Sequence, residues 1–555
     1  MFAPTVPART SESDGHMPQM PARADALATL GTESFDLVII GGGITGAGVA
    51  REAALAGWRV ALIERDDFAS GTSSRSSRLV HGGVRYLEHG HLSLVFESSR
   101  ERRLLLSLAP HLVRPLAFTW PVYRGARVPL WKVRAGLTLY DALALFRNVH
   151  GHSALRPDGV LAIEPALERS GLVGGARYWD AATDDARLTL ASALAAREAG
   201  AVVVNHATVV AGLHGTPGSR LEGVRVVDRL TSAQIEVRAP LIVNATGPWS
   251  DATAALTGAA SGTQLLGSAG AHLSVPRHRV GNNDAITIVS PLDGRVMFVL
   301  PAGAHTIIGT TEHPARSGPD EIRATELDVQ YLLRSVNMLF PNANLTPDDV
   351  IAAWAGIRPL AAARAGEHSA NTASREHAIA RRSDGLLSVT GGKLTTYRAM
   401  AADVFAAAQR EYRSTGGASP VTRLRTERSD HAVLPGGSFQ SRETLMAEIR
   451  QAVHDPAVVE RLALAYGSRW PSVWAFATRD AALAHRIVDD LPYLTAEVAH
   501  AVEREMACTL SDILIRRTHI AFETRDHGRA TARRIAPLVA TLLGWTDTEQ
   551  AQRLA

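Results

Sequence analysis

Three glycines and one glutamate near the start of the chain have the types and spacing that suit dinucleotide binding. Gly41, Gly43 and Gly46 match the pattern G-x-G-x-x-G, in which glycines let the backbone approach a pyrophosphate closely. Glu64 follows about 20 residues later, where an acidic side chain accepts hydrogen bonds from a ribose 2′-hydroxyl. Together these residues predict a site for an adenine dinucleotide.

The elements expected around these residues form a β-α-β unit. Leu37–Ile40 is a continuous apolar run, which is typical of a buried parallel strand. A helix is expected over Ala47–Ala56 and a second strand over Arg59–Ile63. The helix would direct its positive N-terminal end at the pyrophosphate. An ordinary β-α-β turn is the alternative, but the combination of strand, glycines, helix, strand and acid argues against it.

A segment near residue 240 places small residues beside the expected dinucleotide. A strand is expected over Leu241–Val243, and it runs into Thr246 and Gly247, where the chain would pass close to the ligand. Glu64 by itself does not separate FAD from NAD. A compact NAD-binding module, however, would not need residues this far along the chain.

A second segment near residue 390 adds to the same site. A strand over Leu386–Val389 is expected to break at Gly391 and Gly392, and a helix is expected to begin near Leu394. The N–H groups and positive dipole at the start of this helix suit the electron-rich pyrimidine edge of a reduced flavin. A nucleotide site assembled from both ends of the chain indicates FAD as the cofactor.

The stretch Ser76–Gly90, with the sequence SSRLVHGGVRYLEHG, is dense in polar residues. Its composition suits a surface turn, a cofactor cradle or a substrate site, and does not decide among them. His89 and His91 are close in sequence, but nothing nearby completes a coordination shell, so no metal site is expected.

The order and spacing of the motifs resemble those of the FAD-dependent, respiratory glycerol-3-phosphate dehydrogenases. The resemblance extends from about Phe35 to about Arg413, with a weaker match to about Gly544. It implies a mixed α/β fold, with a glutathione-reductase-like FAD-binding Rossmann domain, an inserted β-sheet substrate domain and a C-terminal α-helical cap domain. The matching stretches include GTSSRSSRLVHGGVRYLEHG (71–90), DDARLTL (184–190), VNATGPW (243–249), IIGTTE (307–312), WAGIRPL (354–360), GGKLTTYR (391–398) and LPGG (434–437).

The resemblance also implies a reaction. The substrate sn-glycerol 3-phosphate would be oxidised to dihydroxyacetone phosphate, with a hydride passing from C2 to flavin N5 and the electrons passing on to a membrane quinone. His272 would remove the alcohol proton, with His81 as its competitor, although Lys393 or an arginine could instead stabilise the developing alkoxide. His272, Arg358 and Lys393 are thus the expected catalytic residues.

Binding residues are carried over in the same way. Arginines are expected around the substrate phosphate, because a guanidinium group forms bidentate, charge-assisted bonds with phosphate oxygens. The expected substrate-binding residues are Arg85, Tyr86, His272, Arg358 and Arg375. The expected cofactor-binding residues are Gly41, Gly43, Gly46, Glu64, Ser73, Ser76, Ser77, His81, Thr246, Gly247, Gly391, Gly392, Leu394 and Thr395.

The expected domain organisation has three parts. Residues 1–34 lack periodicity and are expected to be a disordered extension, and residues 430–555 are expected to be the cap domain, with a role in dimerisation. Arg516 and Arg517 are expected at a solvated helix end rather than at a nucleic-acid site. Within 35–415, the FAD-binding segments are about 35–110, 180–260 and 350–412, and the substrate-domain segments are about 111–179 and 261–349.

Charge and composition bear on the compartment and the partners. The net charge is only +3, and Cys508 is the single cysteine, so no intrachain disulfide is possible and a reducing cytosol is expected. Residues 100–147 carry nine basic and two acidic residues. Interleaved aromatic residues suit an anionic membrane surface, and a solvated basic face is the alternative. The membrane quinone that the resemblance implies favours peripheral attachment to the inner face of the cell membrane. These aromatic residues are Trp120, Tyr123, Trp131 and Tyr140.

Three other functions are alternatives to this one. A glycerol-3-phosphate oxidase would have a similar site but would pass electrons to oxygen. An amino-acid or glycine oxidase would need a carboxylate clamp, and an FAD-dependent tRNA-modifying protein would need a broad basic face. One departure from the family pattern stands at Glu312, where an aspartate is usual, and Glu312 is therefore left out of the expected site.

Overall fold

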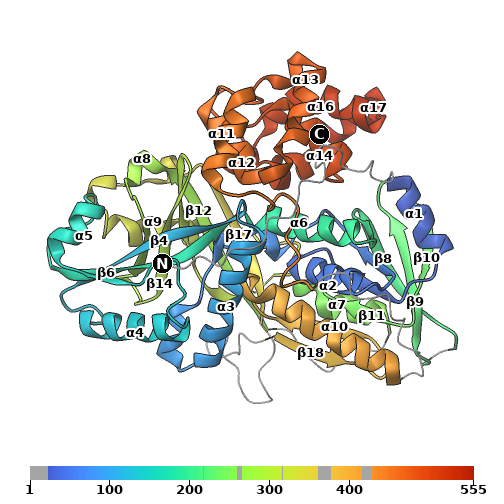
Figure 1. Cartoon of the computed structure of the whole chain (residues 1–555), viewed down its shortest axis with the longest axis horizontal. Coiled ribbons are helices and arrows are strands. Elements are labelled where there is room, and N and C mark those ends of the chain that lie inside the picture. The colour runs from blue at the N-terminus through green and yellow to red at the C-terminus, as the bar shows by residue number, and fades with distance from the viewer. Residues whose placement is uncertain are drawn as a thin grey trace.

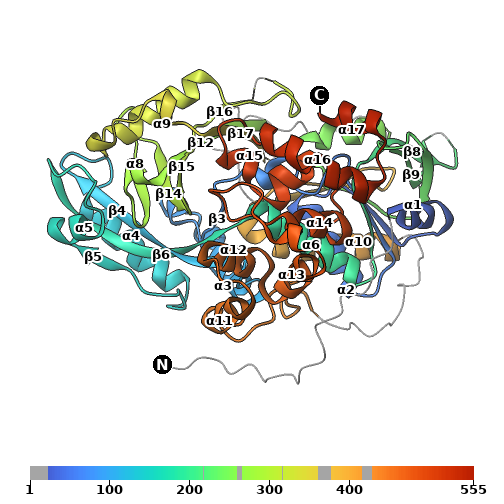
Figure 2. The same ribbon diagram turned by 90° about the horizontal axis from the view of Figure 1, so that it is seen from above.

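The computed structural model describes residues 23–216, 218–258, 266–315, 317–360, 377–414 and 428–554. These residues form three β-sheets with helices packed on their faces. The two larger sheets lie side by side, and the C-terminal helices lie together at the top of the view in Figure 1. Seen from above in Figure 2, these helices cover the boundary between the two sheets.

The first large sheet contains the expected β-α-β unit. Its order is β18-β19-β11-β1-β2-β7, and all its neighbours are parallel except β18, which is antiparallel to β19. The strands and the helix expected from the sequence are present, with small shifts at their ends. The bounds are β1 (Leu37–Ile40), α2 (Ile44–Leu55), β2 (Val60–Ile63), β7 (Val202–Val204), β11 (Ile242–Asn244), β18 (His377–Arg381) and β19 (Leu387–Gly391).

Strand β1 is buried on both faces. Leu37 and Ile39 pack into a core with helices α2, α6 and α10, whereas Val38 and Ile40 pack into a core with the small sheet β8-β9-β10. A parallel strand that is covered on both sides needs apolar residues at every position, which explains the continuous run in the sequence. The further bounds are α6 (Asp185–Glu198), β8 (Ala207–His214), β9 (Leu221–Asp228), β10 (Gln234–Arg238) and α10 (Tyr397–Ser414).

The second large sheet has the order β16-β12-β15-β14-β13-β4-β6-β3, with β17 paired to β12 and β5 paired to β6. Helix α9 covers one face, and helices α3 and α4 cover the other. The bounds of its strands are β3 (Leu79–Val80), β4 (Val113–Tyr123), β5 (Ser153–Leu155), β6 (Leu172–Thr183), β12 (Leu266–Pro276), β13 (Ala285–Val289), β14 (Val296–Ala302), β15 (His305–Gly309), β16 (His313–Pro314) and β17 (Ala352–Leu360). The helices are α3 (Leu92–Leu108), α4 (Leu130–Leu143) and α9 (Glu326–Asn337).

Two short segments expected in the cofactor domain belong to this second sheet. Strand β3 pairs with β6, and strand β17 pairs with β12 along nine residue pairs, from Leu266↔Leu360 to Ser274↔Ala352. Residues 79–80 and 352–360, which lie within the predicted FAD-binding segments, are therefore strands of the second sheet. The pairing of β17 with β12 brings residues 352–360 directly to the expected site.

The C-terminal part is helical throughout the segments with regular structure, as expected for the cap domain. Its helices enclose two hydrophobic cores, one around α11 to α13 and one around α14 to α16. Among the helices that the structure describes, none has the length and apolar character needed to span a membrane. The bounds are α11 (Arg442–Ala452), α12 (Pro456–Tyr466), α13 (Trp470–Arg479), α14 (Thr495–Arg504), α15 (Ile520–Glu523), α16 (Arg529–Leu543) and α17 (Asp547–Leu554).

Part of the segment expected to be disordered is a helix, so that expectation is wrong over Arg23–Thr32, which forms α1. Leu30 is fully buried in the core below the small sheet. Arg23 donates a hydrogen bond of 2.7 Å to the Asp228 carboxylate. Ala26 and Leu27 pack against the same core, and Arg23 also donates to the carbonyl oxygens of Asn205 and His206 at 2.9 and 3.2 Å, so apolar and polar contacts together hold α1 against the first domain. Residues 1–22 lie outside the described residues.

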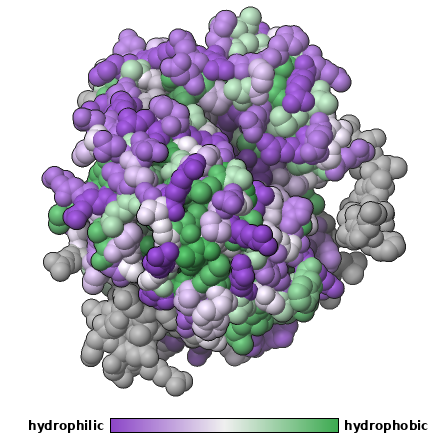
Figure 3. Space-filling model, turned by 90° about the vertical axis from the view of Figure 1, so that its left-hand side faces the viewer, coloured by the Kyte–Doolittle hydropathy of each residue, from purple (hydrophilic) through white to green (hydrophobic). Residues whose placement is uncertain are grey.

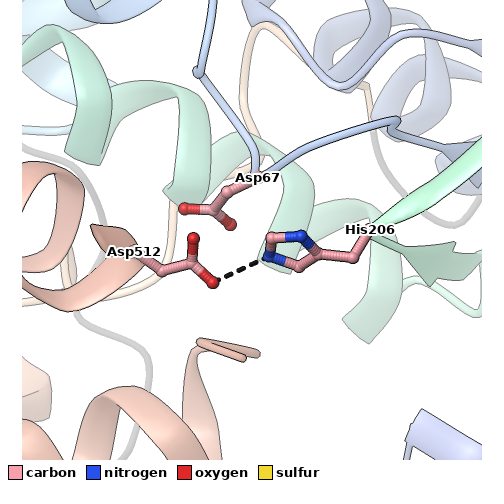
Figure 4. A group of neighbouring side chains, drawn as sticks. All are labelled: Asp67, His206 and Asp512. Carbon is pink, nitrogen blue, oxygen red and sulfur yellow. Dashed lines mark hydrogen bonds and ion pairs between the residues drawn. The ribbon is translucent and has the colours of Figure 1, made fainter. Parts of the chain in front are cut away.

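Arg516 and Arg517 are buried, at 9% and 1% exposure, so the expected solvated helix end is also wrong. Both donate to the buried Asp67 carboxylate, at 2.6 and 2.7 Å. His206 and Asp512 lie beside Asp67, and Nε2 of His206 is 2.9 Å from Oδ2 of Asp512 (Figure 4). Because these carboxylates already accept bonds from guanidinium groups, the cluster joins the C-terminal domain to the first domain through ion pairs.

Candidate active site

A cavity of about 440 Å³ lies at the carboxyl ends of β1, β2, β11 and β19 and reaches β12 and β17 of the second sheet. Open α/β sheets bind ligands at this end of their strands. The cavity wall contains Gly41, Gly43, Glu64, Ser73, Ser76, Ser77, His81, Tyr86, Thr246, Gly247, His272, Arg358, Gly391, Gly392, Lys393, Leu394 and Thr395. Residues far apart in the sequence are thus brought together around one space.

The glycine motif shapes one end of this cavity. Gly41 has a φ of +106°, and a Cβ atom on it would lie only 2.7 Å from the Ala245 carbonyl oxygen. Gly43 precedes α2 and provides no side-chain cap, while the Ser73 hydroxyl accepts a bond of 3.0 Å from Ile44 N–H. The positive end of α2 therefore opens towards the cavity, which fits a pyrophosphate.

Gly46 has a different role from the other two glycines. It does not line the cavity, and a Cβ atom on it would lie 1.9 Å from the Gly41 carbonyl oxygen. The missing side chain lets α2 pack closely on the glycine turn. This is the helix-packing role of the third glycine in the motif.

Glu64 lies at the end of β2, as predicted, and it is buried. Its carboxylate accepts bonds from Gly42 N–H and from Asp66 N–H at 2.9 Å. Burial raises the pKa of Glu64, and the two backbone bonds oppose that rise. The carboxylate is therefore fixed in place at the cavity wall, where a ribose hydroxyl would meet it.

The opposite end of the cavity is built by the turn after β19. Gly391 and Gly392 have φ values of +77° and +88°, conformations that favour glycine. Lys393 then precedes the short helix Leu394–Thr396, which leads into α10 and has no side-chain cap. Thr395 Oγ accepts a bond of 3.1 Å from His81 N–H, so this turn is tied to the segment 76–90.

Two neighbouring serines point to different partners. Ser76 donates a hydrogen bond of 2.6 Å to the buried Asp185 carboxylate at the start of α6. Ser77 Oγ lies 2.8 Å from Nε2 of His272 on β12. Ser77, predicted at the cofactor, therefore also contacts the residue predicted to act on the substrate.

His272 is 3% exposed, and its ring lies at the cavity wall. Burial lowers its pKa to about 3, and the positive charges of Arg358 and Arg78 add to this effect. Within the described part of the chain, Nδ1 has no hydrogen-bond partner. Gly309 of β15 is paired with His272 of β12. A Cβ atom on Gly309 would lie 2.1 Å from the imidazole Cδ2, so this glycine leaves room for the ring.

His272 and Arg358 are on the same face of the β12-β17 pair. In this pairing Ser268 is opposite Arg358, Gly270 is opposite Gly356, and the next pair on the same face contains His272. The two glycines line the cavity. Since neither has a side chain, Gly270 leaves room for Thr310 and the Arg358 guanidinium group, and Gly356 leaves room for Arg75.

Two contacts position the Arg358 guanidinium group. Its Nη2 donates a bond of 3.2 Å to Thr310 Oγ, and Nη1 lies 3.8 Å from a Glu312 carboxylate oxygen. Glu312, the residue that departs from the family pattern, is therefore beside the site rather than remote from it. Arg375 and the side chain of Arg85 lie outside the described residues.

Lys393, Tyr86 and His81 form another part of the cavity wall. The Lys393 ammonium lies 3.7 Å from the centre of the Tyr86 ring, and the rings of Tyr86 and His81 are 6.3 Å apart and nearly parallel. Lys393 also donates to Ser98 Oγ at 3.4 Å. A cation from the β19 turn is thus held against the segment 76–90, in which His81 is predicted at the cofactor and Tyr86 at the substrate.

Sequence reasoning missed two arginines of the segment 71–90. Arg75 lines the cavity, and burial followed by the charge of Arg323 lowers its pKa. Arg78 has a φ of +55°, and its guanidinium lies 5.8 Å from the Trp354 ring. Both lie in the matching stretch 71–90, next to the serines predicted at the cofactor. That position could have indicated that they lie near the site.

Comparison with known proteins gives consistent results along the chain. Residues 36–398 match the family described as FAD dependent oxidoreductase, and residues 427–550 match the C-terminal domain of alpha-glycerophosphate oxidase. Glycerol-3-phosphate dehydrogenase 2 of Mycobacterium tuberculosis is 39% identical, covering 96% of this chain and 89% of its own. The human mitochondrial glycerol-3-phosphate dehydrogenase is 35% identical, covering 96% of this chain and 74% of its own.

Solved structures agree with these sequence matches. The glycerol-3-phosphate dehydrogenase of Bacillus halodurans complexed with FAD has a TM-score of 0.78 and 30% identity, over 96% of this chain and 95% of that one. The expected FAD cofactor, mixed α/β fold and C-terminal helical domain are therefore confirmed. The chain is an FAD-dependent oxidoreductase and belongs to the family of glycerol-3-phosphate dehydrogenases.

Proposed function

We propose that this chain oxidises sn-glycerol 3-phosphate at C2 to dihydroxyacetone phosphate, with FAD as the immediate electron acceptor. The observation that carries the proposal is the placement of Arg358 and His272 on one face of β12-β17, separated by two glycines and facing the FAD cavity. A phosphate-binding cation and a proton acceptor are the two groups that this reaction needs. When bound, FAD supplies the acceptor for the two electrons, at N5 of the flavin.

Arg358 is the proposed ligand of the substrate phosphate. Its guanidinium lies at the cavity wall and is steadied by Thr310, so it is oriented before the substrate arrives. A planar guanidinium can bind two phosphate oxygens at once, which fixes the orientation of the alcohol as well as its position. Arg85 and Arg375 remain predicted partners of the same phosphate.

His272 is the proposed base. With its pKa lowered to about 3, the imidazole is neutral at ordinary pH, and its proton affinity is low before the substrate binds. A bound dianionic phosphate would offset the charge of Arg358, one of the causes of that low pKa, and so raise the proton affinity of His272 in the substrate complex. Lys393 would meanwhile stabilise negative charge at the pyrimidine edge of the flavin.

We further propose that the electrons pass to a quinone in the cell membrane. In this proposal the protein is attached to the inner, cytoplasmic face of that membrane. Helices α3 and α4 and the turn after α4 expose Phe96, Trp131 and Phe146, at 44%, 70% and 75% exposure. Exposed basic residues such as Lys132 and Arg134 lie beside Trp131 on α4. Figure 3 shows the side of the molecule that carries α4, β6 and α5 (Pro157–Ile163) in Figure 1, and a hydrophobic area bordered by hydrophilic side chains lies near its centre.

The predicted aromatic set on this surface needs correction. Trp120 and Tyr140 are buried, at 6% and 0% exposure, and belong to the core under α4. Tyr123 is half-buried, and its hydroxyl donates to the Glu168 carbonyl oxygen at 2.9 Å. Of the four predicted aromatic residues, Trp131 is therefore the exposed one.

The acceptor can be tested on the purified holoenzyme. The flavin is first reduced anaerobically with sn-glycerol 3-phosphate and is then mixed with a soluble quinone analogue or with oxygen. Faster reoxidation by the quinone supports a dehydrogenase. Faster reoxidation by oxygen would instead support the oxidase alternative, and a flavin that is not reduced in the first step would contradict the proposed substrate.

A further inference from the structure

Trp354 packs directly against the proposed base. The two residues are opposite each other in the β12-β17 pairing. The rings of His272 and Trp354 have their centres 5.6 Å apart and their planes within 13° of parallel. Both side chains are buried, so the indole restricts how far the imidazole can tilt.

Trp354 is in turn backed by the C-terminal domain. Phe522 of α15 places its ring 5.4 Å from the Trp354 ring at an angle of 68°. Ser274, on the same strand as His272, donates to the Phe522 carbonyl oxygen at 3.4 Å. The Arg78 guanidinium lies 5.8 Å from each of the two rings. A residue more than 240 positions away along the chain therefore closes the stack behind His272.

The start of α15 is itself fixed to the cofactor domain. His519, directly before α15, lies with Nε2 2.7 Å from the Asp184 carboxylate at the start of α6. At the other end of α15, the Tyr493 hydroxyl donates to Glu523 at 2.8 Å. Phe522 is thus held between two polar anchors, one outside its own domain and one within it.

We propose that Trp354 and Phe522 are positioning residues for His272, and that the C-terminal domain takes part in the reaction by holding the imidazole through this stack. The inference rests on the proposed role of His272. An imidazole with a hydrogen bond to Ser77 at one nitrogen and a stacked ring on one face has little freedom to turn. Small displacements of a catalytic group can cost large factors in rate, so a looser stack would slow proton removal.

The test replaces Phe522 with leucine and measures flavin reduction by sn-glycerol 3-phosphate in anaerobic stopped flow. Phe522→Leu is expected to slow flavin reduction roughly 10-fold, with FAD content and the apparent Kd for the substrate unchanged. Phe522→Tyr, which keeps the ring, is expected to retain most of the rate. Phe476→Leu is the matched control, because Phe476 is a buried aromatic of the same domain that packs on His500 instead. It should leave the rate unchanged.

A double-mutant cycle separates positioning from general loosening. In a His272→Asn background, Phe522→Leu should cause no further loss, because the group that it positions is absent. Independent, multiplying losses would overturn the inference, as would a wild-type rate in Phe522→Leu. If Phe522→Leu does not give folded, FAD-loaded protein, Trp354→Phe carries the same comparison. Failure of the proposed function would be distinguishable from failure of this inference, because sn-glycerol 3-phosphate would then not reduce the flavin of the wild-type protein.

Discussion

At the scale of single residues, the site depends on side chains that are missing as much as on those present. A Cβ atom on Gly270 would lie 2.6 Å from Thr310 Oγ and 2.9 Å from an Arg358 nitrogen. Any larger residue there would push the guanidinium group from its position. Gly309 likewise leaves room for the His272 ring, so these glycines let the imidazole and the guanidinium group, the proposed base and the proposed phosphate ligand, take their places at the cavity wall.

Replacing Arg358 tests the phosphate site. Arg358→Ala is expected to raise the KM for sn-glycerol 3-phosphate roughly 10- to 100-fold, because it removes charge-assisted hydrogen bonds worth about 1.5–3 kcal/mol. FAD content should be unchanged, and steady-state kinetics with flavin absorbance measures both quantities. Arg279→Ala is the control, since Arg279 pairs with Asp349 in the same domain but does not line the cavity. An unchanged KM in Arg358→Ala would remove it from the phosphate site.

Replacing His272 tests the base. His272→Asn is expected to lower the rate of flavin reduction roughly 10²- to 10⁴-fold with FAD retained, as for the loss of a general base. His305→Asn, a buried histidine of the same sheet outside the cavity wall, should keep a near-normal rate. Stopped-flow flavin reduction distinguishes the two variants. A near-normal rate in His272→Asn would eliminate it as the base.

At the scale of elements, local sequence patterns predicted the strands and helices, but they did not predict which strands pair with one another. The apolar runs of β1, β2, β11 and β19, with the glycines after β1, β11 and β19 and Glu64 after β2, predicted strands that end at one site. The membership of β17 in the second sheet depends on β12, about 90 residues earlier, and no local pattern encodes that pairing. On α4, by contrast, Val133, Leu137 and Tyr140 recur at helical spacing and are buried, so the burial of Tyr140 could have been predicted.

The exposed part of α4 carries its own prediction. Trp131→Ala combined with Phe146→Ala is expected to weaken binding to anionic vesicles roughly 10-fold or more, because two exposed aromatic side chains no longer enter the interface. Vesicle flotation with anionic and neutral lipid measures the effect. Leu327→Ala is the control, since Leu327 is 76% exposed on α9, away from this surface. Absence of flotation for the wild-type protein in both lipids would contradict membrane docking.

At the scale of the whole molecule, the C-terminal domain is joined to the rest by buried charges. Arg516 and Arg517 reach Asp67, about 450 residues earlier, and Arg187 of α6 pairs with Glu505 at 2.6 Å. Two arginines at the end of a helical pattern predict a solvated helix end. The prediction fails because the acid that binds them, Asp67, is remote in the sequence. Sequence alone therefore predicted the helical domain but not how it is attached.

Buried histidines make this assembly sensitive to acid. Burial lowers the pKa of His111 and His272 to about 3 and that of His500 to about 4, with neighbouring arginines adding to the effect. In the unfolded chain these groups take up protons near pH 6.5, which the folded state resists. Their contribution to stability is thus full above pH 6.5 and is lost as the pH falls towards 4. Burial raises the pKa of Glu164 to about 7, so below pH 7 the folded state binds a proton at this carboxyl group that the unfolded chain does not. This uptake offsets the proton of one of the three histidines.

The thermal midpoint is therefore expected to fall between pH 7 and pH 5. Each of the three histidines lowers the unfolding free energy by about 1.4 kcal/mol per pH unit below 6.5, and the carboxyl groups whose pKa burial raises, Glu64, Glu97, Glu164 and Asp185, act in the opposite direction. His111→Gln should reduce the slope of the unfolding free energy against pH by about one proton, or about 1.4 kcal/mol per pH unit. His278→Gln, at an exposed position, should leave the slope unchanged. Equal slopes for wild type and His111→Gln in thermal-shift measurements would contradict this account.

The most direct test of the central claim is the anaerobic reduction of the bound flavin. The holoenzyme is mixed with sn-glycerol 3-phosphate or with an equal concentration of glycerol, and the oxidised-flavin absorbance is followed together with product formation. The account predicts full loss of that absorbance with sn-glycerol 3-phosphate, one dihydroxyacetone phosphate formed per flavin, and no comparable reduction by glycerol. An unreduced flavin, or equal reduction by glycerol, would contradict it.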